Sequence, residues 1–183
     1  WIPGSYLIRE FARHFVAVRA QAGGAPVALA KTAKNEWQAA PCAGPLTVVA
    51  HVYAFDLSVR AAYLDATRGY FNGPAVFLCP AGRERAPCVV DIARPEGPAF
   101  DGWRVATTLP SAGAPPWDFG QYAAADYDEL IDHPVTAGRF DLAHFTAGGV
   151  PHDIAVSGRH AADLPRLAAD LARVCQWQVD LFG

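Results

Sequence analysis

The sequence has no methionine and begins at Trp1, followed closely by a Pro-Gly pair at residues 3 and 4 that is typical of a turn. A chain with this beginning is expected to start inside a longer protein. The lack of a recognisable signal peptide therefore says little about its compartment. The cytoplasm is slightly favoured over the periplasm, but the sequence does not determine the location.

Two classes of partner are disfavoured by what the chain lacks. No apolar run approaches the roughly 20 residues that a membrane-spanning helix needs. The 15 basic residues are scattered, and the net charge is -3, so no basic stripe is available for a phosphate backbone. We therefore expect neither a membrane nor a nucleic acid as a partner.

The sequence also lacks the common catalytic motifs. It contains no H-E-x-x-H, no G-x-S-x-G and no glycine-rich phosphate loop. None of its four cysteines belongs to a C-x-x-C pair, so zinc-ribbon and thioredoxin spacings are absent. Cys79 and Cys88 could face each other across a hairpin, although small buried thiols are the favoured interpretation of these residues.

What is present is a composition typical of a folded domain, with 52% hydrophobic and 18% charged residues in 183. Short alternating or apolar runs separated by Gly- and Pro-rich turns predict several strands. The run at 46–55 is apolar on both faces, which predicts a central strand that is buried on both sides. The other predicted strands lie at 14–22, 26–31, 75–78, 86–94, 102–109, 138–147 and 150–158.

Two segments have helical character. Residues 124–134 predict one short helix that stops at a proline, and residues 163–182 carry an apolar stripe at helical spacing. Asp163 is placed to cap the second helix, and Pro165 stands in its first turn, where proline is tolerated. The predicted fold is therefore mainly β: an antiparallel, sandwich-like domain with one short helix, followed by a C-terminal amphipathic helix.

Three groups of residues are candidates for a site. His144 and His152 could meet across a hairpin and bind a metal together with Asp153, although ordinary surface histidines explain the pattern as well. An acidic cluster lies around Tyr127 in the short helix, and a solvated helix face is its favoured interpretation. The cluster consists of Asp126, Asp128, Glu129 and Asp132. Three tryptophans could serve recognition if exposed, but core packing is favoured for them: Trp37, Trp103 and Trp117.

Five segments, taken together and in order, resemble the glycyl-aminopeptidase-like zinc metallopeptidases. These are bacterial gluzincins that often carry a C-terminal PDZ domain. The segments are WIPGSYLIREFARH, VYAFDLSVRAAYLD, RGYFNGPAVFL, YDELIDHPV and GVPHDIAVSG. The resemblance covers essentially the whole chain. It implies that residues 1–160 are an N-terminal β-sandwich domain lacking its first strands, and that residues 161–183 are the first helix of a truncated catalytic domain.

The resemblance further implies that zinc, its ligands and the H-E-x-x-H helix of the parent protein lie beyond Gly183. No catalytic or metal-binding residue can then be assigned within this chain, and no cofactor is expected in it. The missing catalytic domain of the same protein would be its partner, covering the apolar stripe of the C-terminal helix.

The leading hypothesis is a non-catalytic N-terminal domain that helps to form the substrate cleft of a zinc-dependent aminopeptidase. Its peptide substrate carries a free amine, and a cation in a partly dry cleft favours carboxylates. The substrate-binding candidates are Tyr127, Asp128, Glu129 and Asp132. Two alternatives stay open: a stand-alone β-sandwich module that binds carbohydrate or protein, and a complete small enzyme with an unrecognised site.

Overall fold

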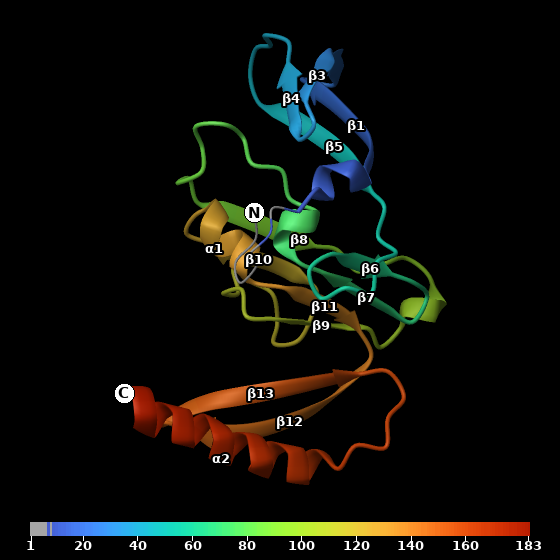
Figure 1. Ribbon diagram of the computed structural model, residues 1–183. Coiled ribbons are helices and arrows are strands. Elements are labelled where there is room, and N and C mark those ends of the chain that lie inside the picture. Colours follow the sequence, from blue (N-terminus) through green and yellow to red (C-terminus); the bar gives the residue numbers. More distant parts are fainter. Residues whose placement is uncertain (1–6, 8) are drawn as a thin grey trace.

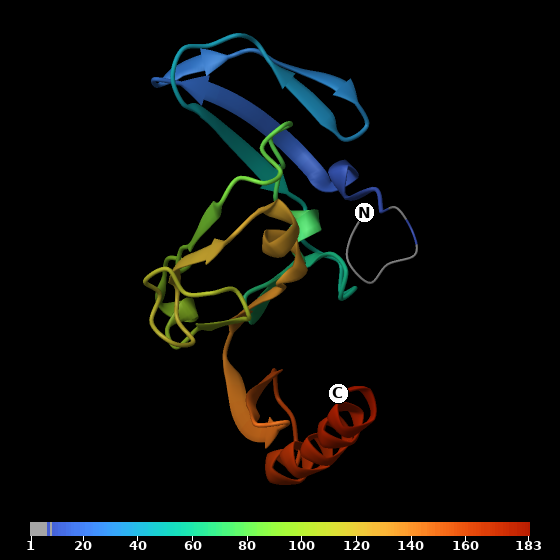
Figure 2. The same ribbon diagram turned by 90° about the vertical axis from the view of Figure 1, so that its left-hand side faces the viewer.

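The computed structural model describes residue 7 and residues 9–183, and it is built mainly from antiparallel strands (Figure 1). The Pro-Gly turn expected at residues 3 and 4 lies outside the described residues. Three parts follow one another along the molecule (Figures 1 and 2). We call them the N-terminal sheets (residues 11–52), the middle unit (62–138) and the hairpin–helix unit (140–182).

The N-terminal sheets begin after a short 3-10 helix, η1 (Phe11–His14). Strand β1 (Phe15–Ala22) turns at two consecutive glycines into β2 (Ala25–Val27), as the sequence predicts. Both glycines have positive φ values, 57° and 82°, which suit the tight turn of a two-residue hairpin. A second hairpin follows, formed by β3 (Leu29–Ala33) and β4 (Glu36–Ala39).

Strand β5 (Leu46–Val52) corrects one prediction. It pairs with β1 and forms the edge of the three-stranded sheet β2-β1-β5 in the described part of the chain. Val48 and Val49 point to opposite faces, yet 41% and 43% of their surfaces are exposed. The expectation of a central strand buried on both faces is therefore wrong. Apolar residues on both faces permit burial, but burial also requires a packing layer on each side.

The middle unit contains the hydrophobic core. Its four-stranded sheet has the order β6 (Ala62–Leu64), β7 (Arg68–Phe71), β11 (Val135–Gly138) and β9 (Arg104–Thr107). A two-stranded sheet joins β8 (Cys88–Ile92) to β10 (Gly120–Ala124), and a short 3-10 helix, η3 (Pro98–Phe100), precedes β9. The core side chains come from β9, β10, β11 and their connections: Val105, Leu109, Ala114, Tyr122, Ala124, Leu130 and Val135.

The strand predicted at 75–78 is not formed. The chain instead makes a 3-10 turn, η2 (Gly73–Ala75), with Pro74 in its first positions. A Cβ atom added to Gly73 would lie 2.7 Å from the Cα atom of Ile131, so the turn packs closely against the backbone of α1 (Tyr127–Asp132). Proline and this close approach of two backbones favour a turn over a strand at this point.

The hairpin–helix unit agrees with the sequence prediction. Strands β12 (Phe140–Ala147) and β13 (Val150–Ser157) pair over their full length around a Gly-Gly turn. Helix α2 (Leu164–Phe182) lies against this hairpin (Figure 1). The carboxylate of Asp163 accepts a hydrogen bond from the backbone N–H of Arg166, which caps the first turn as expected.

The apolar stripe of α2 is covered unevenly. Ala168 is buried against the hairpin and Leu167 is half-buried, whereas Trp177 is 64% exposed and Phe182 is 82% exposed. The final turns of α2 are therefore more open than its first turns. Among the described residues, no helix has the length and apolarity needed to cross a membrane. The fold class, mainly antiparallel β with a short helix and a C-terminal helix, is confirmed.

Candidate functional site

Two of the acidic side chains at helix α1, Asp126 and Glu129, cap its first turn. The side chain of Asp126 accepts a hydrogen bond of 2.9 Å from the backbone N–H of Glu129. The carboxylate of Glu129 in turn accepts a hydrogen bond from the backbone N–H of Ala125. This reciprocal arrangement resembles a capping box, which satisfies N–H groups that the first helical turn leaves unpaired. Glu129 is therefore engaged with the backbone of its own helix.

Two further groups at α1 have structural partners. The Tyr127 hydroxyl donates a hydrogen bond of 3.1 Å to the carbonyl oxygen of Phe77, and burial raises the pKa of this phenol to about 12. The hydrogen bond from the Glu129 N–H, followed by the guanidinium of Arg85 at 3.2 Å, lowers the pKa of Asp126. Tyr127 thus holds the helix against the segment that follows η2, and Asp126 is already ion-paired with Arg85.

Asp128 and Asp132 have more open surroundings. They are four residues apart, which places them on the same face of α1. Both residues are exposed, and the Asp128 carboxylate lies 4.0 Å from the nearest nitrogen of Arg85. The structure therefore brings two of the four predicted residues together on one solvent-facing surface. It gives Tyr127 and Glu129 contacts within the domain.

The predicted meeting of His144 and His152 does not occur. In the β12–β13 register, His144 is opposite Asp153 and His152 is opposite Phe145. Because neighbouring residues of a strand point to opposite faces, the two imidazoles lie on different sides of the hairpin. His144 pairs with the Asp153 carboxylate, and His152 stacks on Phe145 with 4.7 Å between ring centroids. In residue 7 and residues 9–183, no three His, Cys, Asp or Glu side chains are grouped for a metal.

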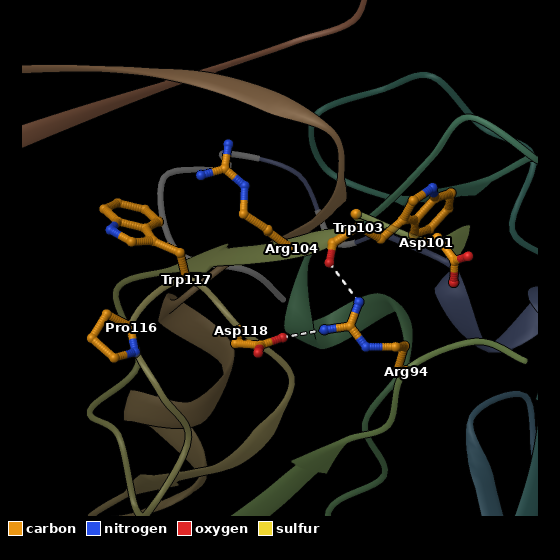
Figure 3. Close-up of a pocket in the computed structure, with 8 residues that line it drawn as sticks. Arg94, Asp101, Trp103, Arg104, Pro116, Trp117 and Asp118 are labelled. Atoms are coloured by element: carbon orange, nitrogen blue, oxygen red, sulfur yellow. Dashed lines mark hydrogen bonds and ion pairs between the residues drawn. The ribbon is translucent and has the colours of Figure 1, made fainter. Parts of the chain in front are cut away.

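A pocket of about 480 Å³ lies at the edge of the middle unit, close to where β12 begins (Figure 3). The guanidinium of Arg94 is held inside it. One nitrogen donates a hydrogen bond of 2.7 Å to the carbonyl oxygen of Trp103, and another pairs with the Asp118 carboxylate. The remaining residues of the lining are Asp101, Gly102, Arg104, Pro116 and Trp117.

Arg104 and Trp117 both contact the ring of Phe140, the first residue of β12. The Arg104 guanidinium lies over this ring, 4.2 Å from its centroid, and donates to the Phe140 carbonyl oxygen. The Trp117 indole meets the same ring edge-on at 6.0 Å. Trp117 has a left-handed backbone with φ of 60°, an uncommon conformation for a bulky residue that often marks a functional or constrained site.

The three candidate tryptophans thus have different environments. Trp103 is 2% exposed and packs edge-on against Phe100, so it belongs to the core as favoured. Trp37 is half-buried against Phe15.

Sequence reasoning did not find the two pocket arginines, because they are separated from each other and from Trp117 by loops whose path no spacing rule predicts. The conformationally restricted segment Pro115-Pro116-Trp117 was the one available signal.

Residues 1–139 match the family model described as the Peptidase M61 N-terminal domain. This match spans more than half of the chain. The chain belongs to this family. The M61 N-terminal match ends one residue before Phe140. All of the pocket lining therefore lies inside the matched region, and the ring that Arg104 and Trp117 contact lies just beyond it.

The whole chain is also similar to a solved structure, an aminopeptidase N family protein from Idiomarina loihiensis. The two share 42% sequence identity, and their folds superpose with a TM-score of 0.94. All of this chain is covered, but only 31% of the Idiomarina chain, so the M61 N-terminal chain spans about a third of that protein. No curated protein matches the chain. The resemblance to a metallopeptidase family found in the sequence is confirmed.

Proposed function

We propose that this chain is the non-catalytic N-terminal domain of a bacterial zinc-dependent aminopeptidase and forms one wall of its substrate cleft. The observation that carries the proposal is the similarity, at 42% identity over the full chain, to part of a longer aminopeptidase N family protein. The family match over residues 1–139 agrees with it. Under this proposal, the active site is built together with a catalytic domain.

Zinc does not fit the residues that the structure describes. A catalytic zinc site needs about three protein ligands that converge on one point, and the described residues present no such group. The proposal therefore assigns the metal and its activated water to the catalytic domain. The role of this chain is to bind and orient the peptide, not to supply the nucleophile.

Within the wall, Asp128 and Asp132 are the groups we propose for the substrate amine. Their carboxylates lie on one exposed face of α1, whereas Tyr127 and Glu129 fix the helix. Two carboxylates that approach one ammonium form charge-assisted hydrogen bonds, which strengthen when the cleft closes and water is excluded. The catalytic domain would also cover the exposed end of α2, where Trp177 and Phe182 are open to solvent.

The first test is the activity of the 183-residue chain. Purified with added zinc, it should not hydrolyse glycyl or alanyl p-nitroanilide, because it lacks a positioned metal-bound water. Zinc-dependent turnover that a histidine substitution within the chain abolishes would contradict the non-catalytic assignment.

The second test uses the longer aminopeptidase that the proposal implies. Asp128→Asn and Asp132→Asn should each raise KM for aminoacyl substrates and leave the melting temperature unchanged. Asp91→Asn, at an exposed position on β8, is the matched control. An unchanged kcat/KM in both α1 variants would remove the amine-binding role from this helix.

A further inference from the structure

The two arginines of the pocket differ in how their charge is satisfied. The Arg94 guanidinium is paired with the Asp118 carboxylate and the Trp103 carbonyl oxygen. Arg104 has no carboxylate partner among the described residues, and one of its terminal nitrogens contacts the Phe140 carbonyl. Its Nε and its second terminal nitrogen have no acceptor among the described residues. Figure 3 shows the Arg104 guanidinium pointing away from the Arg94–Asp118 pair.

Trp117 adds a second unpaired donor and an aromatic wall. Its indole N–H has no acceptor among the described residues, and its ring shares the contact to Phe140 with Arg104. The left-handed backbone of Trp117 is held by a hydrogen bond of 3.1 Å from the N–H of Val105 to its carbonyl oxygen. An aromatic residue held in an unfavourable conformation beside a cation is pre-positioned and loses little freedom when a ligand binds.

We propose that this pocket binds a single carboxylate carried on a planar or apolar body. The Phe140 carbonyl uses one N–H of the Arg104 Nη2, and the second N–H of this nitrogen forms a parallel pair with a neighbouring N–H of the guanidinium. This pair matches the two oxygens of a carboxylate, and the Trp117 ring covers the attached body. Asp101 and Asp118 line the same pocket, so a doubly charged phosphate is disfavoured by repulsion. A volume of about 480 Å³ is suitable for a small ligand or one terminal residue.

This chemistry has two sources, the C-terminal residue of a peptide and a free organic acid. Binding is a property of the pocket in this chain, so the inference does not depend on the aminopeptidase assignment. Either source supports the proposal, and the probes below distinguish them.

The test is a titration of the 183-residue chain followed by the indole N–H signals in ¹H–¹⁵N spectra. The probes are N-acetyl-glycyl-phenylalanine, its C-terminal amide, benzoate and inorganic phosphate. The indole signal that disappears in Trp117→Phe identifies Trp117. We expect it to shift with the free-acid peptide, with benzoate, or with both, and not with the amide or phosphate.

Two variants test the contact with Arg104. Arg104→Gln should weaken carboxylate binding by about tenfold, because a charge-assisted hydrogen bond is lost. Arg104→Lys keeps the charge near Phe140 but loses the paired nitrogens, and it should weaken binding while retaining the parent melting temperature. Arg173→Gln, at an exposed position on α2, is the control and should bind as the parent does.

Three results would overturn the inference. One is a Trp117 signal that no probe shifts. Another is an equal response to the peptide amide or to phosphate, which would mean general attraction without carboxylate recognition. The last is unchanged affinity in Arg104→Lys, which would remove the paired contact.

Discussion

The middle unit encloses an apolar core, whereas β5 and the end of α2, toward the two ends of the described chain, leave large apolar side chains partly uncovered. Val105 and Val135 in the middle unit are each 1% exposed, whereas Val48 in the N-terminal sheets and Phe182 in the hairpin–helix unit remain open. All three parts are rich in apolar residues, so composition does not explain the contrast. The middle unit packs two sheets and α1 around a shared core. By contrast, β5 is an edge strand, and Trp177 and Phe182 in the last turns of α2 are open to solvent.

The largest expected effect separates the middle unit from the N-terminal sheets. Val135→Asp places an unpaired charge in the closed core, and we expect a loss of more than about 3 kcal/mol in the free energy of unfolding. Val48→Asp puts the same charge on the exposed edge strand and should cost within about 1 kcal/mol. Urea unfolding of both variants measures the difference.

Similar losses in the two variants would mean that β5 is as well covered as the core. That result would restore the central strand that the sequence predicted at 46–55 and would remove the contrast between the two parts.

Local pattern was sufficient where one element decides its own structure. The stripe of α2, the Asp163 cap and the Gly-Gly turn of β1–β2 all follow from short-range rules, and each is observed. Pattern failed where the answer depends on a distant layer. The runs that form β7, β10 and β11 were not recognised, because these strands are four or five residues long and gain their stability from strands far away in sequence.

The candidate sites show the same division. The capping role of Glu129 is a local pattern, but the separation of His144 from His152 depends on the hairpin register, which shifts a side chain to the other face with one residue. The pocket combines Arg94, Arg104 and Trp117 through two loops and a sheet. No spacing in the sequence encodes that convergence.

A medium effect should appear within α2 itself. Leu167→Ser removes a half-buried side chain beside the buried Ala168, and we expect a loss of about 1–2 kcal/mol. Phe182→Ser removes a side chain that is open to solvent, so the stability of the chain should change by less than about 0.5 kcal/mol. The same variant should reduce self-association, because it removes exposed apolar surface.

Thermal unfolding and sedimentation velocity at several concentrations check both expectations for α2. A large destabilisation by Phe182→Ser in a strictly monomeric sample would mean that the end of α2 is covered within the chain. The contrast between covered and uncovered parts would then hold only for β5.

The smallest expected effect lies at the rim of the middle unit, in the turn between β6 and β7. The Asp65 carboxylate accepts hydrogen bonds from the Thr67 hydroxyl and N–H, both at 2.7 Å, and from the Tyr63 hydroxyl at 2.8 Å. These bonds, the Thr67 hydroxyl first, hold the pKa of Asp65 well below its usual value of 3.8. Below pH 3.8 the unfolded chain binds a proton that the folded chain does not, so this stabilisation is present above that pH and is lost as pH falls through the folded pKa.

Asp65→Asn should therefore melt at a lower temperature than the parent at pH 6, and the difference in melting temperature should narrow toward pH 2. Asp91→Asn is the control and should show a constant offset. A gap for Asp65→Asn that stays constant over the same range would mean that the charge of this carboxylate does not stabilise the turn.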